Sequence, residues 1–159
     1  MPISSGRTIQ RQPLMFLIDT NVISEARKGE RADAGVRAFW ADAVRDDTPL
    51  FLAAITIGEL RRGVELIRHR GDHLQAQRLE QWLMEVLETY GDRVLDFDGD
   101  AAQLWGRLRV PHPHNAIDKQ IAAIAVLHDL TVVTRNTTDF AGCGVRLLNP
   151  FQEIGRAHV

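Results

Sequence analysis

Short apolar runs that end in polar residues alternate with helix-like segments along most of this 159-residue chain. A continuous apolar run is typical of a strand that is buried on both faces of a parallel sheet. Strands that alternate with helices predict an α/β fold with a mostly parallel sheet and right-handed crossovers. The five runs that we interpret as strands are residues 14–18, 50–54, 94–97, 131–134 and 145–148.

Two of the segments between these runs have apolar residues at helical spacing. A long helix is expected over about residues 72–90. A second is expected to place Ile117, Ile121, Ile124 and His128 on one face, because they are four, three and four residues apart. Three tryptophans lie in helical patterns and are expected in the core or at an interface: Trp40, Trp82 and Trp105.

The length of the chain suits one domain, and no repeat or linker divides it. We expect the domain over residues 15–151, with residues 1–14 and 152–159 as flexible ends because they are polar and unpatterned. No apolar run approaches the roughly 20 residues of a membrane span, and the N-terminus lacks the apolar stretch of a signal peptide. The single cysteine, Cys143, cannot form an internal disulfide. These features predict a cytoplasmic protein without a membrane partner.

Acidic residues follow the predicted strands or begin the predicted helices. Asp19 ends the first strand, and Glu59 lies about one turn into the helix after the second. Asp118 begins a helix, and Asp139 follows the fourth strand. Each acid alone has a structural explanation as a helix cap, a charge that favours a helix N-terminus, or a turn residue. Because the carboxyl ends of parallel strands meet at one edge of a sheet, the predicted fold gathers the four acids there.

Carboxylates that lie close together repel one another, and one of them takes up a proton unless a cation neutralises the group. Ligands that are all oxygen atoms favour Mg²⁺ or Mn²⁺ over zinc. Such an ion activates water and stabilises the charge that develops on a phosphodiester. The net charge of −2 means that a nucleic acid would be bound by local contacts and not by the overall field. The residue types therefore predict metal-assisted hydrolysis of phosphodiesters.

Four segments in order resemble the motifs of PIN-domain proteins, and specifically those of the VapC and FitB toxins of bacterial toxin–antitoxin pairs. These segments are residues 16–25, 54–63, 118–125 and 134–140, and residues 149–151 (Asn-Pro-Phe) resemble a typical ending of the family. The resemblance covers nearly the whole chain, from Met15 to about Phe151.

The resemblance implies a single PIN-like domain with a five-stranded parallel sheet, Mg²⁺ or Mn²⁺ as cofactor, and endoribonuclease activity. It also implies a toxin homodimer that a small antitoxin protein inhibits. It assigns Asp19, Glu59 and Asp118 to an acidic metal site. The fourth position stays open between Asn136 and Asp139, since some relatives have an aspartate at the first place and others have this chain's pattern.

Polar side chains beside the acids are expected to orient them. By the resemblance, Thr20 and Asn21 hold Asp19 in place, and Thr134 belongs to the same group. Arg61 and Arg62 follow Glu59 closely and are candidates for contact with RNA. The alternative is that these arginines belong to an ordinary solvated helix face.

Other kinds of site fit the sequence less well. His69 and His73 are four residues apart, but Gly71 and Asp72 interrupt the helix, and no third zinc ligand is evident. The Pro-His-Pro-His segment, residues 111–114, is interpreted as a rigid loop, with a zinc site as the alternative.

One enzyme class and one signalling class are disfavoured because this chain lacks residues that they need. A phosphatase of the haloacid dehalogenase type needs a second aspartate two residues after Asp19, where this chain has Asn21. A response-regulator receiver needs paired acids at an early strand end and a late lysine after a strand, which have no counterpart here. The remaining alternative is a non-catalytic PIN-fold binding module that acts in a regulatory complex with an antitoxin. RNA cleavage that depends on a divalent ion would distinguish the nuclease from this module.

Overall fold

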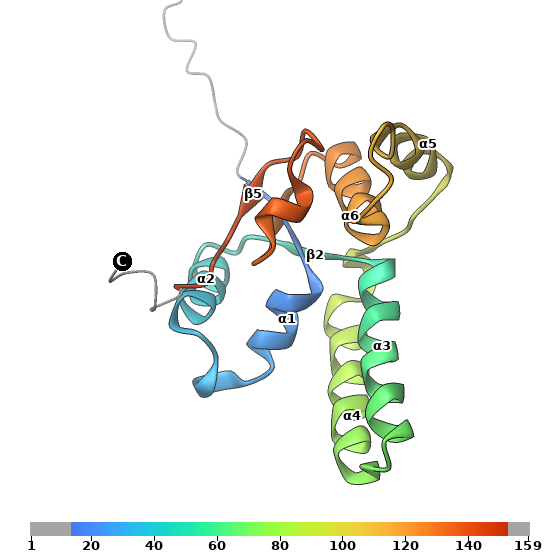
Figure 1. The fold of residues 1–159 in the computed structure, drawn as a ribbon. Helices are drawn as coiled ribbons and strands as arrows, with labels where there is room; N and C mark the ends of the chain where they lie inside the picture. The colour runs from blue at the N-terminus through green and yellow to red at the C-terminus, as the bar shows by residue number, and fades with distance from the viewer. Residues whose placement is uncertain (1–13, 153–159) are drawn as a thin grey trace, which may run out of the picture.

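The computed structural model describes residues 14–152 and has a parallel sheet with helices on both faces (Figure 1). Its strands are β1 (Phe16–Ile18), β2 (Leu50–Ala53), β3 (Val94–Leu95), β4 (Thr131–Val133) and β5 (Leu147–Leu148). Its α-helices are α1 (Thr20–Ala26), α2 (Ala34–Arg45), α3 (Ala54–His69), α4 (His73–Tyr90), α5 (Gly99–Leu108) and α6 (Ala116–Leu127). Short 3₁₀ helices are η2 (Gly29–Arg31), η3 (Gly91–Arg93) and η4 (Thr137–Phe140).

The predicted fold class and the positions of all five strands are confirmed. The strand order is β3-β2-β1-β4-β5, and every neighbouring pair is parallel. Each strand is shorter than its apolar run, because a residue counts as strand only where it pairs with a neighbour. For example, β1 pairs with β4 over three residues, from Phe16 opposite Thr131 to Ile18 opposite Val133.

Successive residues of a strand point to opposite faces, and each face has its own buried apolar cluster. Ile18 and Val133 pack into a cluster with residues from α1, α2, α3 and α4. Leu17 and Val132 pack into a second cluster with residues from α5, α6 and η4. Burial on both faces explains why these strands have no alternating polar positions.

The expected apolar face of α6 is only partly correct. Ile121 and Ile124 are fully buried, but Ile117 is 42 % exposed and His128 is also exposed. The middle of the helix is covered on several sides by β4, η4 and α5, so its alanines are buried as well. Both ends of the helix extend beyond this cover, and the periodic pattern therefore overestimates the length of the buried face.

Helices α3 and α4 form an antiparallel hairpin that extends from the sheet (Figure 1). The break predicted at Gly71 and Asp72 is confirmed. Gly71 has a φ of 92°, a left-handed conformation that glycine adopts without strain. The Asp72 carboxylate accepts a hydrogen bond from the Gln75 N–H at 3.2 Å and so caps α4.

The three tryptophans pack as expected. Trp40 and Trp82 lie against the cluster formed by α1 to α4. The Trp105 ring meets the Phe97 ring edge to face, with centroids 5.9 Å apart. The Trp105 indole N–H also donates to the backbone oxygen of Ala116 at 2.9 Å.

The segment after β5 docks on the first turn of α2. The Asp33 Oδ1 atom accepts the N–H groups of Gly35 at 2.8 Å and of Gln152 at 3.0 Å. A Cβ atom at Gly35 would lie 2.0 Å from the Pro150 oxygen, so this close approach requires glycine. Apart from Leu14 and Gln152, the ends that we expected to be flexible lie outside the described residues. Within the described part of the chain, no helix is both long and apolar enough to cross a membrane.

Candidate active site

The strand order places a switch point between β1 and β4. From β1 the chain adds β2 and β3 on one side of the sheet, and it then adds β4 and β5 on the other side. In open α/β sheets, ligands bind beyond the carboxyl ends of the strands at such a point. Asp19 follows β1 there and Thr134 follows β4, with the Asp19 N–H donating to the Val133 oxygen at 2.9 Å.

Asp19 is buried, with 4 % of its surface exposed, and three groups hydrogen-bond to its carboxylate. Its Oδ1 accepts the Thr20 N–H at 2.8 Å. Its Oδ2 accepts the Thr134 hydroxyl at 2.7 Å and the Asn21 amide at 3.3 Å. Asp19 is thus the cap of α1, and its second carboxylate oxygen is bound by groups from the loop after β4 and from α1. Burial raises the pKa of Asp19 above its ordinary value although these hydrogen bonds oppose the shift, and the charge of Asp139 raises it further.

Thr134 connects the groups around Asp19. Its side chain is fully buried, and its hydroxyl accepts the Asn136 N–H at 3.0 Å and the Asn21 amide at 3.3 Å while it donates to Asp19. The Thr134 hydroxyl therefore uses its one donor and both of its acceptor positions. Asn21 also accepts the Arg135 N–H at 3.0 Å, which joins the start of α1 to the loop after β4. Asn21 and Thr134 contact Asp19 through their side chains, as expected, whereas the Thr20 contact comes from its backbone N–H.

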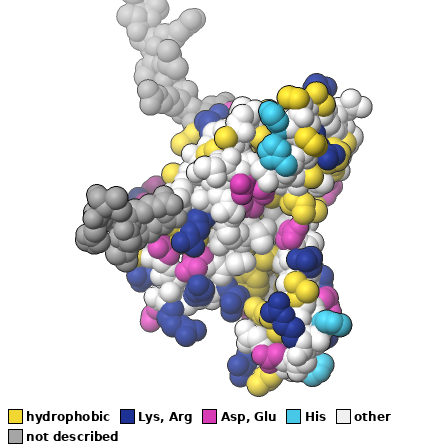
Figure 2. Space-filling view, in the orientation of Figure 1, with side chains coloured by type: hydrophobic (Ala, Val, Ile, Leu, Met, Phe, Trp, Pro, Cys, Tyr) yellow, Lys and Arg dark blue, Asp and Glu magenta, His cyan; other side chains and the backbone are white. Residues whose placement is uncertain are grey.

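The charges of the predicted acids act on Asp118. Asp118 is the third residue of α6, and its pKa is raised from 3.8 to about 6. Burial is the largest cause, followed by the charges of Asp19, Asp139 and Glu59. The structure therefore brings the four expected acids close enough for their charges to interact. Figure 2 shows acidic side chains near the centre of the face that it displays.

Asn136 and Asp139 differ in their surroundings. Asn136 is exposed, and its backbone N–H is the group that contacts Thr134. Asp139 is half-buried in η4, and its charge acts on both Asp19 and Asp118. Of the two side chains, Asp139 is the one whose charge acts on the other acids.

The donor set suits a hard divalent cation because it consists of carboxylate oxygens. Mutual repulsion among Asp19, Glu59, Asp118 and Asp139 is the electrostatic condition that such an ion would relieve. In residues 14–152, however, no group of three or more Asp, Glu, His or Cys side chains is placed to hold an ion as the structure stands. Ion binding would therefore require the acidic side chains to close onto a common point.

The substitution Asp118→Asn is expected to stabilise the metal-free protein at about pH 8 and to have little effect below pH 3.8. Because the folded-state pKa is raised, the stability that a protonated Asp118 provides is complete below 3.8 and is lost as the pH rises through about 6. A shift of this size corresponds to ~3 kcal/mol, which solvent screening of the half-buried side chain reduces to ~1 kcal/mol.

Urea unfolding of the wild type and of this variant in a chelating buffer, at several pH values, measures the effect. A variant that is less stable than the wild type at about pH 8 would show that Asp118 is not under repulsion from the other acids.

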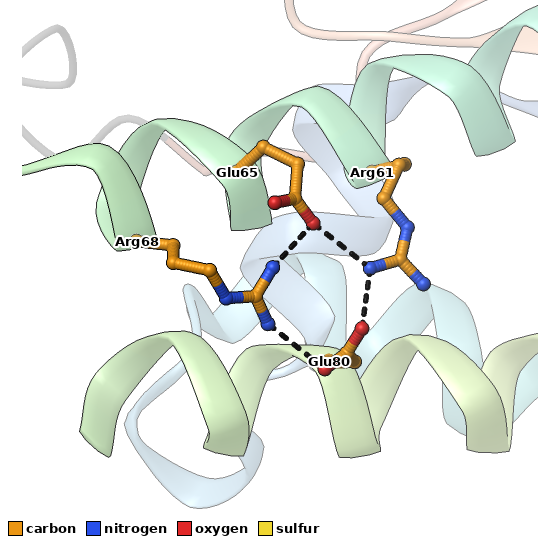
Figure 3. Close-up of polar contacts among 4 residues, drawn as sticks. All are labelled: Arg61, Glu65, Arg68 and Glu80. Carbon is orange, nitrogen blue, oxygen red and sulfur yellow. Dashed lines mark hydrogen bonds and ion pairs between the residues drawn. The ribbon is translucent and has the colours of Figure 1, made fainter. Parts of the chain in front are cut away.

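Arg61 does not face the acids as a free cation. Its guanidinium contacts the carboxylates of Glu65 at 3.1 Å and Glu80 at 2.6 Å, and Arg68 pairs with the same two carboxylates (Figure 3). These four charges link α3 to α4. The Arg61 guanidinium, a candidate for contact with RNA, is therefore engaged in ion pairs within the α3–α4 hairpin. The Arg62 side chain is exposed.

Lys119 is a feature that the sequence reasoning missed. It is only 5 % exposed, and its ammonium donates to the backbone oxygen of His112. A lysine inside the apolar segment that includes Ile121 and Ile124 is unusual, because buried lysines need a polar partner. A lysine within an apolar helical segment is the sequence feature that could have indicated this buried group. The sequence does not identify the hydrogen-bond partner of Lys119.

The sequence profile of the PIN domain matches residues 16–142. The chain belongs to the PIN-domain family. Within the family it is similar to toxin FitB of Neisseria gonorrhoeae, with 36 % identity over 87 % of this chain and 100 % of that protein. It is also similar to the VapC ribonuclease Y4jK of Sinorhizobium fredii, with 38 % identity over 87 % of this chain and 99 % of that protein. The resemblance to VapC and FitB proteins is confirmed.

Three solved structures have a similar fold. FitAcB from Neisseria gonorrhoeae matches with a TM-score of 0.69 and 35 % identity, covering 86 % of this chain and 98 % of that one. FitAB bound to an IR36 DNA fragment also has a TM-score of 0.69, with 33 % identity over 86 % of this chain and 95 % of that one. A toxin–antitoxin complex from Klebsiella pneumoniae has a TM-score of 0.57 and 25 % identity, over 85 % of this chain and 97 % of that one.

Proposed function

We propose that this PIN-domain protein is a metal-dependent endoribonuclease and the toxin of a type II toxin–antitoxin system. The observation that carries the proposal is that the charges of Asp19, Asp139 and Glu59 all act on Asp118, near the end of β1 at the switch point of the sheet. A relative with 38 % identity is named a VapC ribonuclease, and another with 36 % identity is named toxin FitB, which supports both parts of the proposal.

Mg²⁺ or Mn²⁺ would be held by Asp19, Glu59, Asp118 and Asp139, with the Asn136 carbonyl as a neutral alternative at the fourth position. When bound, the ion supplies an activated water and compensates the charge that develops on the phosphodiester. The chain's own contribution is to fix the carboxylates. Burial and the Thr134 hydroxyl hold Asp19 in one orientation, and helix α6 carries Asp118 to the same edge of the sheet.

Sequencing of RNA ends after induction of the protein in cells tests this function. We expect new ends at defined positions with the wild type and none with the Asp118→Asn variant expressed at the same level. If both proteins produce the same RNA ends, or neither produces any, the chain is not a nuclease that uses this site.

The proposed partners are a small antitoxin and a second copy of the chain, in the cytoplasm where the RNA lies. A cavity of about 580 Å³ between α1, α2 and α4, lined by Ile23, Trp40 and Trp82 among others, suits an apolar antitoxin segment. Exposed apolar side chains on α6, such as Ile117 and Leu127, suit contact with another chain. Light scattering should give a two-chain mass, and the small protein encoded beside this chain should suppress cleavage.

A non-catalytic binding module remains the second candidate, because a similar structure contains a DNA fragment. The complete set of acids around Asp19 favours catalysis over this alternative. A module of this kind would bind its partners equally well after Asp118→Asn and would cut no RNA in either form.

The Asp139→Ala variant is expected to need more Mn²⁺ for half-maximal activity than the Asn136→Ala variant. Asp139 contributes a charge to the acidic site, whereas the exposed side chain of Asn136 contributes none. Titration of cleavage against Mn²⁺ concentration measures both variants under identical conditions. The opposite ranking would assign the fourth position to Asn136.

A further inference from the structure

We propose that His112 and His114 bind a phosphate group of the RNA strand at the edge of the acidic site. The proposal rests on the nuclease function proposed above and adds a substrate contact to it. Both residues lie in the α5–α6 loop, residues 109–115, which connects Leu108 to Ala116.

Side chains from both neighbouring helices hold this loop in place. The buried Lys119 ammonium donates to the His112 oxygen, and the Arg109 guanidinium donates to the Pro113 oxygen at 3.3 Å. The Arg109 guanidinium also stacks over the Trp105 ring at 4.6 Å, and the Trp105 indole N–H binds the Ala116 oxygen. A loop with two fixed carbonyls, and with the first residue of α6 also held, presents its side chains in a defined arrangement.

The two imidazoles lie side by side and are turned outward. Their ring centroids are 5.6 Å apart with an interplanar angle of 55°, and both residues are exposed. Neither imidazole makes a hydrogen bond or ion pair with another residue in the part of the chain that the structure describes. The loop is thus held through its backbone, and both rings keep N–H donors for a ligand.

The loop leads directly into the site. His114 precedes Asp118 by four residues, and α6 begins between them. Figure 2 shows histidine side chains near acidic side chains on the same face. A strand that places one phosphodiester among the acids would therefore pass beside the pair.

Electrostatics explains why such a contact is needed. The acids repel a polyanion, and the net charge of −2 provides no general attraction. Arg61, the cation that the sequence placed nearest to Glu59, is paired with Glu65 and Glu80. Imidazole donates a hydrogen bond to phosphate whether it is neutral or protonated, so the pair adds donors for phosphate beside the acids.

The test uses the double substitution His112→Ala/His114→Ala in two backgrounds. In the cleavage-deficient Asp118→Asn protein, fluorescence anisotropy with a short fluorescein-labelled single-stranded RNA should show about tenfold weaker binding. In the otherwise wild-type protein, KM for the same RNA should rise about tenfold while kcat changes less than about twofold, as expected for loss of uniform binding.

Two further variants make the result specific. His69→Ala/His73→Ala removes a matched exposed pair at the α3–α4 turn and should leave binding unchanged. His112→Lys/His114→Lys should restore binding, because a lysine also donates to phosphate.

Wild-type affinity in the alanine variant would overturn the proposal, and failure of the lysine variant to restore binding would exclude a phosphate contact. If the proposed nuclease function itself is wrong, the parent Asp118→Asn protein will not bind the RNA and the wild type will not cleave it. That outcome differs from a failure of the histidine pair alone, in which the parent binds and the substitutions have no effect.

Discussion

The Asp118→Asn variant is expected to cleave RNA at least about a thousandfold more slowly than the wild type with saturating Mn²⁺. The substitution removes the carboxylate of Asp118, whose pKa is raised to about 6 by burial and then by the charges of Asp19, Asp139 and Glu59, and with it a carboxylate oxygen for the cation. Single-turnover cleavage of a labelled RNA measures the loss. The same variant is expected to be more stable than the wild type in metal-free buffer, so inactivity will not be explained by unfolding.

Asp100→Asn provides a matched control for this prediction. Asp100 also lies in the first turn of a helix, α5, but it is exposed and does not act on the pKa of Asp118. We expect wild-type cleavage from this control. If Asp118→Asn retained the wild-type rate with the same metal dependence, the assignment of the acidic site would be wrong.

The Thr134→Val variant is expected to bind Mn²⁺ about 10–100-fold more weakly than the wild type, as judged from the half-saturating concentration for cleavage. Valine matches threonine in shape but cannot donate to the buried Asp19 carboxylate or accept the Asn136 N–H. The pKa of Asp19, already raised by burial, would rise further without the Thr134 hydrogen bond, and the orientation of its carboxylate would be less defined. Loss of buried hydrogen bonds is also expected to cost ~1–3 kcal/mol of folding stability.

Thr131→Val is the control for Thr134→Val. Thr131 is the first residue of β4 and is also buried, but its hydroxyl accepts a hydrogen bond from Arg146 at the opposite end of the strand. Its substitution should leave the Mn²⁺ requirement unchanged. Equal Mn²⁺ requirements in the two variants would show that Thr134 does not position Asp19 for the cation.

The layered fold and the acidic site follow largely from local features of the sequence. Strands buried on both faces need uninterrupted apolar runs, so runs such as residues 131–134 indicate their positions directly. Parallel pairing then brings Asp19, Asp118 and the other acids to one edge. The structure confirms that Asp19 caps α1, and its carboxylate also accepts the Thr134 hydroxyl, so the cap is compatible with the proposed role in the acidic site.

Features that depend on packing between distant elements could not be predicted. Ile117 is exposed because the elements that pack on α6 leave its first turn uncovered. The helical spacing of apolar residues does not predict how far that packing extends. The engagement of Arg61 depends on Glu80, which lies 19 residues away on another helix. The burial of Lys119 depends on a hydrogen bond from its ammonium to the His112 carbonyl in the preceding loop.

The most direct test of the central claim is cleavage of a defined single-stranded RNA by the purified protein, with and without a divalent ion. We predict no cleavage in excess chelator, cleavage when Mg²⁺ or Mn²⁺ is restored, and no restoration in the Asp118→Asn variant. Cleavage that continues in chelator, or that the variant performs at the wild-type rate, would contradict a nuclease site built from Asp19, Glu59, Asp118 and Asp139.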